Sequence, residues 1–210
     1  MGRDYILHKV RTALGRHVDQ PPPPLPPVML RVPDVPVETR IASLCARVEA
    51  LAGTAYRASS PADALDYVKS VIGDAPAVSA CDPYLTQCGI TALANVRDGV
   101  TNRQELRELC ATVRFGITSA DYCLGDTGTL VMLASRDEAR LISLLPPVHI
   151  AVVPRERILT GLDELLTLVP LPAEGTSSMV LITGPSRTGD IEQFLVRGVH
   201  GPGEIHVVIV

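Results

Sequence analysis

The stretch HIAVV at residues 149–153 decides the fold predicted for this chain, because it is short, apolar and rich in β-branched residues. Runs of the same kind recur at residues 113–116, 128–134, 179–183 and 205–210. Strands that are apolar at every position are typical of a sheet buried on both faces. Weaker patterns predict shorter strands at residues 54–58, 75–80 and 91–96.

Helical patterns separate several of these strands. Apolar residues recur at helical spacing from Ile41 to Leu51, and Ser60-Pro61 and Asn102 with Glu105 are typical helix starts. Strand–helix alternation predicts a mostly parallel sheet with helices on both faces. We therefore predict an α/β domain over residues 37–210.

The N-terminal residues 1–36 have a different composition. Residues 3–16 are predicted as a short amphipathic helix, and PPPPLPPVMLRVPDVP at residues 21–36 as an extended, semi-rigid strap. The favoured interpretation is a spacer that lays the helix on a neighbouring surface, which in a homo-oligomer is another subunit. A ligand for an SH3-type domain is the alternative, because PxxP spacing occurs.

Composition narrows the class of protein. The net charge is −4, so the chain has no general field that attracts nucleic acid. No secretory signal and no apolar run of about 20 residues is recognisable, which predicts a cytoplasmic protein without a membrane span. The five cysteines contain no Cys-x-x-Cys pair and are predicted to be small buried residues. We therefore expect no metal site and no cofactor in this chain.

In open α/β sheets, ligands bind where loops follow the carboxyl ends of strands. The loop TGPSRTGDIE at residues 183–192 is predicted to turn sharply and to start a helix that continues through residues 191–195. Unpaired amides at that helix start, with the guanidinium of Arg187, would form an anion site. The predicted ligand contacts are Gly184, Ser186, Arg187 and Thr188. The alternative is a capped turn in which Arg187 pairs with an acid.

A second loop, GITSADYCLGDTGTLVMLAS at residues 116–135, frames a carboxylate and a hydroxyl with glycines. A short helical turn is predicted at residues 118–123, before Asp126 and the next strand. Ligand contacts are predicted at Thr127, Gly128 and Thr129. A plain hairpin or strand entry is the alternative interpretation.

Two histidines lie near predicted strand ends, His149 at the start of one strand and His200 just before the last. An arginine that holds a carboxylate and a neutral histidine that accepts a hydroxyl proton would suit a hydroxy acid. Asp126, His149 and His200 are therefore the candidates for proton handling. The alternative for each histidine is a hydrogen-bonded structural role. No hydride-acceptor site is recognisable.

Several sequence blocks together resemble the lactate utilization protein C family (LUD domain), over roughly residues 37–210. The blocks occur in the order of that family, as GIT at 116–118, DTGTLV at 126–131, LP at 145–146, HIAVV at 149–153, GPSRTGDIE at 184–192 and GVHGP at 198–202. The chain departs from the family pattern at Asp126, where a glutamate is often found, and at Gly189, where alanine is. The shorter carboxylate puts the position of one contact in doubt.

The resemblance implies a domain similar to the NagB/RpiA/CoA transferase-like fold. It also implies a role beside two partner proteins in the oxidation of L-lactate to pyruvate, with the iron–sulfur clusters in those partners. It assigns no catalytic residue. Two other classes stay open: a self-sufficient acyl/CoA-transferase-like or isomerase-like enzyme, with Asp126 as nucleophile, and a non-catalytic assembly or sensor subunit that docks through residues 1–36.

Overall fold

A computed structural model describes residues 2–21, 24, 29–135, 140–189 and 195–210. Its centre is a six-stranded, fully parallel sheet. In spatial order the strands are β1 (Thr54–Arg57), β12 (Glu204–Ile209), β7 (Val148–Val153), β4 (Phe115–Thr118), β2 (Ala77–Ser79) and β3 (Val96–Arg97). All residues of β7, β4 and β2 are buried, as their largely apolar pattern predicts, and the burial includes the polar residues His149, Thr118 and Ser79. The predicted α/β class is confirmed.

Helices cover one face of this sheet. The main ones are α3 (Pro61–Ile72) and α5 (Arg103–Thr112). Three shorter elements also pack on this face: α4 (Pro83–Gln87), the 3₁₀ turn η1 (Ile90–Ala92) and α6 (Arg140–Leu144). The predicted helix starts are confirmed, since Ser60 Oγ accepts from the Asp63 amide at 3.2 Å and Asn102 Oδ1 accepts from the Glu105 amide at 3.0 Å.

The other face is covered by α2 (Val37–Ala50) and by a second sheet of four strands. That sheet has the order β8 (Ile158–Leu159), β5 (Tyr122–Leu124), β6 (Thr129–Leu133) and β9 (Met179–Thr183). Between and after these strands lie η2 (Arg155–Arg157), α7 (Leu162–Leu168) and α8 (Pro172–Gly175), and α7 packs on the outer face of the second sheet.

The second sheet corrects the prediction that all the apolar runs join one mostly parallel sheet. β6 pairs antiparallel with both β5 and β9, so the runs at 128–134 and 179–183 belong to this smaller sheet. The helical turn predicted at 118–123 is also wrong, because Tyr122–Leu124 is a strand. The strand predicted at 91–96 is largely wrong, because only Val96 of that range lies in β3, and residues 91 and 92 belong to η1.

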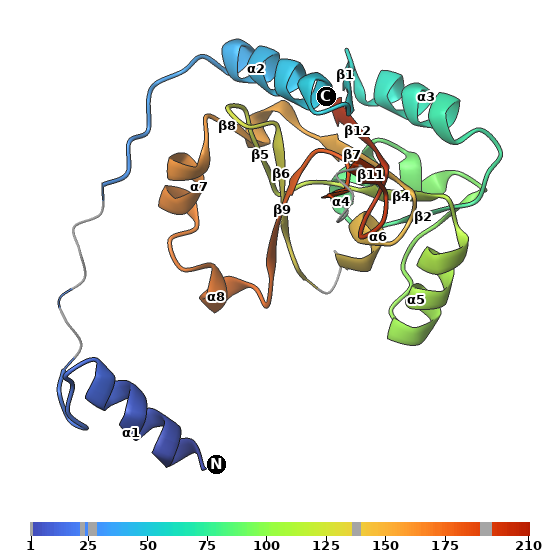
Figure 1. Cartoon of the computed structure of the whole chain (residues 1–210). Coiled ribbons are helices and arrows are strands. Elements are labelled where there is room, and N and C mark those ends of the chain that lie inside the picture. Colours follow the sequence, from blue (N-terminus) through green and yellow to red (C-terminus); the bar gives the residue numbers. More distant parts are fainter. Residues whose placement is uncertain (1, 22–23, 25–28, 136–139, 190–194) are drawn as a thin grey trace.

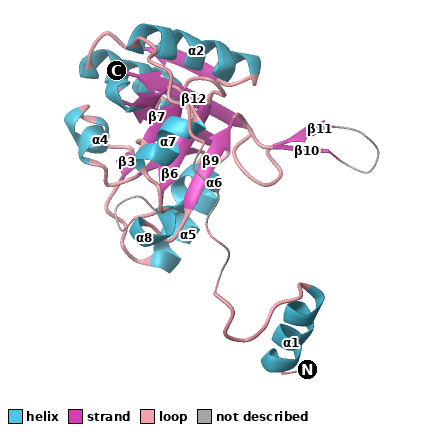
Figure 2. Ribbon diagram, turned by 90° about the vertical axis from the view of Figure 1, so that its left-hand side faces the viewer, coloured by secondary structure: helices cyan, strands magenta, loops and turns pink. Residues whose placement is uncertain are grey.

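The segment after β9 forms a hairpin where the sequence predicted a helix start. β10 (Arg187–Gly189) pairs antiparallel with β11 (Leu195–Arg197), and Figure 2 shows this pair projecting away from the body. The helix predicted to continue through 191–195 is therefore wrong at Leu195. Residues 190–194 lie outside the described part of the chain.

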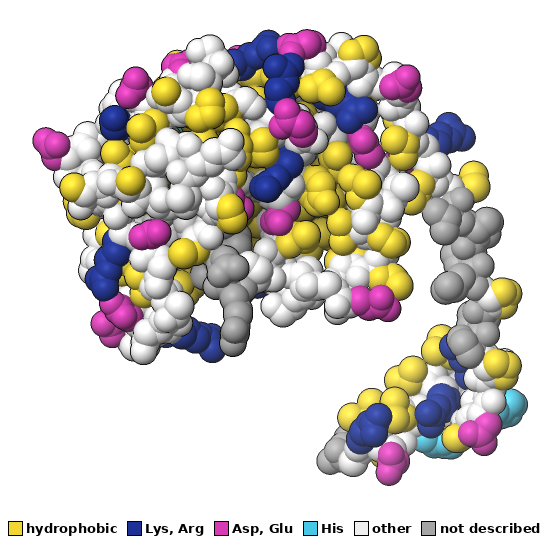
Figure 3. Space-filling model, turned by 180° about the vertical axis from the view of Figure 1, so that it is seen from behind, with side chains coloured by type: hydrophobic (Ala, Val, Ile, Leu, Met, Phe, Trp, Pro, Cys, Tyr) yellow, Lys and Arg dark blue, Asp and Glu magenta, His cyan; other side chains and the backbone are white. Residues whose placement is uncertain are grey.

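The N-terminal helix α1 (Arg3–Ala13) stands apart from the body (Figure 1) and has no buried residue. Its apolar side chains Tyr5, Ile6, Val10 and the following Leu14 are 47 to 66% exposed. Within the described residues, no helix has the length and apolar character needed to cross a membrane. On the rear face, charged side chains of both signs are interspersed with hydrophobic ones (Figure 3), and this face shows no continuous basic stripe.

The cysteine prediction is confirmed in part. Cys88, Cys110 and Cys123 are buried, and burial raises the pKa of the Cys123 thiol to about 12. Cys81 is exposed, contrary to the prediction. It follows β2 at the edge of the parallel sheet, where apolar packing ends.

Candidate functional site

Asp126 lies in the turn that joins β5 to β6, so the hairpin interpretation of this loop is correct. The Gly125 amide donates to the Leu159 carbonyl at 2.9 Å, and the Asp126 amide donates to the Thr160 carbonyl at 3.1 Å. The Gly128 amide closes the turn on the Leu124 carbonyl at 3.0 Å. These amides, which the glycine-rich composition predicts to be bare, are used within the protein. The Asp126 side chain itself is exposed.

The glycines of this turn are required by the close approach of helix α2. A Cβ on Gly125 would lie 2.9 Å from the Arg40 carbonyl oxygen, and one on Gly128 would lie 2.7 Å from Arg47 Cβ. Gly128 also has a φ of +72°, which side chains disfavour. Packing against α2 therefore explains both glycines without a ligand.

A chain of hydroxyl groups joins this turn to the end of β9. Thr127 Oγ1 is 2.8 Å from Thr129 Oγ1, which is 2.9 Å from Thr183 Oγ1. Thr129 is buried, whereas Thr127 and Thr183 are exposed. Gly184 follows at once and packs against the end of α2, where its Cβ would lie 2.9 Å from Leu51 Cβ. The structure thus brings the two predicted loops together.

The remaining contacts predicted in the third loop are engaged with the protein itself. The Ser186 amide donates to the Pro202 carbonyl at 2.8 Å, and Ser186 Oγ lies 3.4 Å from the His200 amide nitrogen. Arg187 donates to the Leu51 carbonyl at the end of α2. Thr188 lies in β10, opposite Val196. Without the predicted helix start, the expected cluster of unpaired amides is not formed at 186–188.

His149 lies apart from these loops, fully buried in β7. Its Nε2 is 2.8 Å from Thr118 Oγ1, and burial lowers the pKa of the imidazole to about 4. Nδ1 has no hydrogen-bond partner within the described residues. A neutral ring with one hydroxyl partner is what the structural alternative predicts. Proton handling by Asp126, His149 and His200 remains a prediction.

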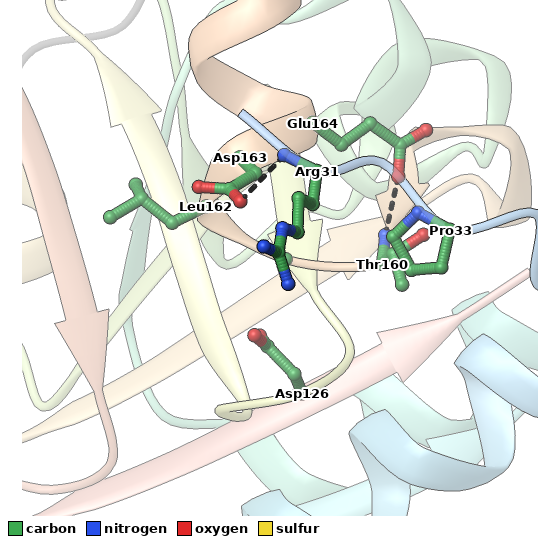
Figure 4. A pocket seen from close by; sticks show the side chains of 8 residues that line it. Arg31, Pro33, Asp126, Thr160, Leu162, Asp163 and Glu164 are labelled. Atoms are coloured by element: carbon green, nitrogen blue, oxygen red, sulfur yellow. Dashed lines mark hydrogen bonds between the residues drawn. The ribbon is translucent and has the colours of Figure 1, made fainter. Parts of the chain in front are cut away.

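A cavity of about 380 Å³ opens beside Asp126 (Figure 4). The strap forms one wall, the β5–β6 turn another, and the start of α7 the third. Its lining residues are Arg31, Pro33, Asp126, Thr160, Gly161, Leu162, Asp163 and Glu164. The predicted site residue Asp126 thus lines a cavity.

Hydrogen bonds fix two of the carboxylates in this cavity. Asp163 Oδ2 accepts from the Arg31 amide at 2.9 Å. Glu164 accepts from the Thr160 amide at 2.6 Å and pairs with Arg40 at 3.1 Å. Burial alone would raise the pKa of Glu164, but the hydrogen bonds from Thr160 and the charge of Arg40 outweigh it and lower that pKa.

A second polar cluster lies beyond the carboxyl ends of β4 and β7. Arg157 Nη1 donates to Ser119 Oγ at 3.0 Å and to the Ala120 carbonyl at 3.1 Å, and lies 3.9 Å from Asp82. Burial raises the pKa of the neighbouring Asp121, whose carboxylate accepts from the Leu133 amide at 2.6 Å. These contacts connect the two sheets.

Sequence reasoning missed Arg31, Thr183 and the Arg40–Glu164 pair. Arg31 is the one cation in the proline-rich segment 21–36, a signal that the spacer interpretation leaves unused. Thr183 is the last residue of an apolar run, and a single hydroxyl at the end of a predicted strand gives no signal of a binding site. The Arg40–Glu164 pair joins residues 124 positions apart, so no local pattern could reveal it.

The chain is similar in sequence and in fold to known proteins. A "Lactate utilization protein C" from Anoxybacillus flavithermus is 31% identical over 152 residues, which cover 70% of this chain and 69% of that protein. One from Halalkalibacterium halodurans is 35% identical over 130 residues, about half of each protein (58% and 56%). A crystal structure of a DUF162 family protein from Deinococcus radiodurans shares the fold, with a TM-score of 0.62 and 19% identity over 84% of this chain and 99% of that one.

The family comparison matches the LUD domain to residues 41–210, which is nearly the whole of the predicted α/β domain. Residues 1–40, including the strap and Arg31, lie outside the match. The relative from Anoxybacillus flavithermus is 31% identical, and the match covers 69% of that protein. The domain match and this identity confirm the resemblance seen in the sequence blocks. The chain belongs to the LUD domain family.

Proposed function

We propose that this chain takes part in lactate utilization, as a subunit of a system that oxidises L-lactate to pyruvate. The observation that carries the proposal is the match to several relatives that are named "Lactate utilization protein C". Within this system the chain would bind a small anionic metabolite. Oxidation of L-lactate releases two electrons and two protons, and the proposal assigns the electrons to the iron–sulfur clusters of partner proteins.

The surface around the end of α2 supports binding of a small anion. Thr127, Thr183 and Arg187 are exposed there, and the hydroxyl chain and the Arg187–Leu51 hydrogen bond hold them in place. Hydroxyl groups and a guanidinium can donate hydrogen bonds to a carboxylate or another small oxyanion. Gly128 and Gly184 let this surface pack closely on α2.

A growth experiment tests the proposal directly. Deleting the gene in its native host should abolish growth on L-lactate as sole carbon source and leave growth on pyruvate unchanged. The wild-type gene supplied on a plasmid should restore growth on L-lactate. Undiminished growth of the deletion strain on L-lactate would remove the chain from this process.

Arg187→Ala tests the predicted anion contact. The affinity for inorganic phosphate, used as the probe of this anion contact, should fall at least tenfold, because a guanidinium–oxyanion contact is lost. The free energy of unfolding should change by less than about 1 kcal/mol, because Arg187 is exposed. Titration calorimetry and thermal unfolding measure the two effects.

Arg197→Ala is the matched control for this variant. Arg197 lies directly opposite Arg187 in the β10–β11 hairpin, is also exposed, and its replacement removes the same charge. The control should bind phosphate as the wild type does. Equal affinities in Arg187→Ala and in the wild type would exclude Arg187 from the binding site.

A further inference from the structure

We propose that the cavity beside Asp126 binds a short α-hydroxy acid, with Arg31 on its carboxylate and Asp126 on its hydroxyl group. This inference rests on the proposed function and assigns the substrate a place. It makes the strap part of the binding site, although the strap lies outside the family match to residues 41–210.

The arrangement of the two charged groups is the first argument. Figure 4 shows the Arg31 side chain extending from the strap into the cavity, toward the carboxylate of Asp126 on the opposite wall. Within the described structure the guanidinium and this carboxylate form no ion pair with each other. A cation and a hydrogen-bond acceptor therefore face each other across an open volume of about 380 Å³.

The charge balance of the cavity is the second argument. Three carboxylates line it, and a negative cavity would repel an anion. Arg40 offsets the charge of Glu164, and the Arg31 amide holds Asp163 in place without neutralising it, so the Arg31 guanidinium is the group in the lining that attracts an anion. The Arg31 guanidinium is then free to hold the carboxylate of a ligand, and Asp126 is free to accept from its hydroxyl group.

The remaining lining residues provide the wall and rim of the cavity. Gly161 lies against Asp126, and a Cβ at this position would collide with the Asp126 carboxylate. The missing side chain keeps Asp126 at the cavity wall and leaves the centre open. Pro33 and Leu162, which is 44% exposed, add apolar surface at the rim. A carboxylate, a hydroxyl and a short apolar group together describe an α-hydroxy acid such as lactate.

The position of the acceptor also predicts a preference between substrate and product. The hydroxyl of L-lactate donates a hydrogen bond to Asp126, whereas the keto oxygen of pyruvate can only accept one. A carboxylate that faces a keto oxygen gains no hydrogen bond and repels its lone pairs. The cavity should therefore bind L-lactate at least tenfold more tightly than pyruvate.

Titration calorimetry of the full chain with sodium L-lactate and sodium pyruvate tests the inference. Arg31→Gln should weaken the binding of both acids at least tenfold. Asp126→Asn should weaken L-lactate binding and reduce the preference for L-lactate over pyruvate. Arg16→Gln is the control, because it removes the same charge from an exposed position just after the N-terminal helix and should bind as the wild type does. Both Arg31 and Asp126 are exposed, so these variants should fold, which circular dichroism checks.

The outcomes separate this inference from the proposed function. Wild-type affinity for L-lactate in both Arg31→Gln and Asp126→Asn would overturn it, and so would a wild-type chain that binds no L-lactate. If the deletion strain fails to grow on L-lactate and is rescued equally by Arg31→Gln and by the wild type, the function stands and the cavity assignment fails. If growth is unaffected but the cavity binds L-lactate as described, the cavity assignment stands and the function fails.

Discussion

Gly116→Ala should abolish the folded state of the protein. Gly116 lies in the central strand β4, and a Cβ at this position would collide with the carbonyl oxygen of Ile142 in α6. It would also lie 3.0 Å from Pro146 Cγ. The collision is with backbone, so no side-chain rotation relieves it. β4 cannot move aside either, because it is paired with β2 and β7.

The expected loss in the free energy of unfolding is more than about 4 kcal/mol, which is a large fraction of the stability of an ordinary domain. Urea denaturation followed by circular dichroism measures it, and accumulation as insoluble protein is the equivalent result in expression. Gly175→Ala is the control. A methyl group on Gly175 would have no atom within 4 Å, so the stability of this variant should stay within about 0.5 kcal/mol of the wild type.

A soluble Gly116→Ala variant that unfolds at the wild-type urea concentration would contradict this prediction. Such a result would mean that α6 packs differently against β4 in solution. The prediction also gives Gly116 a structural reason for its place in the sequence block GIT, since the backbone of α6 occupies the volume that a side chain would need.

The main sheet could be predicted because its strands carry a local signal. Every position of β7 is apolar or buried, and two-sided burial in this pattern is typical of a parallel sheet. The division into two sheets has no such local signal. Thr129 pairs with Thr183, 54 residues away, and the apolar runs of β6 and β9 resemble those of β7. Strand composition indicates burial and does not indicate the pairing partner.

The candidate site was predictable in part for a similar reason. The sequence identified Asp126 and the turn that carries it, because glycines beside a polar residue predict a turn. It could not distinguish glycines that approach a ligand from glycines that approach a helix. Gly128 and Gly184 both prove to pack on α2. Arg31 lies at the site because the strap passes over it. A proline-rich composition predicts an extended strap but not the direction in which the strap runs.

Acidification should destabilise the protein through His149, and this is the second large effect expected. The imidazole has a pKa of about 4 in the folded state, against about 6.5 in an unfolded chain. Between these values the unfolded state binds more protons, so stability falls as the pH falls. The contribution of the neutral ring is complete above about pH 6.5. About 2 kcal/mol should be lost at pH 5 and about 3 kcal/mol below pH 4.

Urea unfolding at pH 7 and pH 5 measures this loss, and His149→Gln isolates its origin. The amide of glutamine can still hydrogen-bond to Thr118 but does not titrate, so the variant should lose about 2 kcal/mol less than the wild type over this range. His200→Gln, which replaces an exposed imidazole in the same way, is the matched control for the substitution itself.

The imidazole can also be observed directly, which covers the case in which His149→Gln fails to fold. Nuclear magnetic resonance of ring-labelled histidine should show the His149 signal unchanged from pH 8 to pH 5. Titration of this signal near pH 6.5 would contradict the prediction and would mean that water reaches the ring. In that case His149 would regain a role in proton handling, because an imidazole that titrates near neutrality can accept a hydroxyl proton at physiological pH.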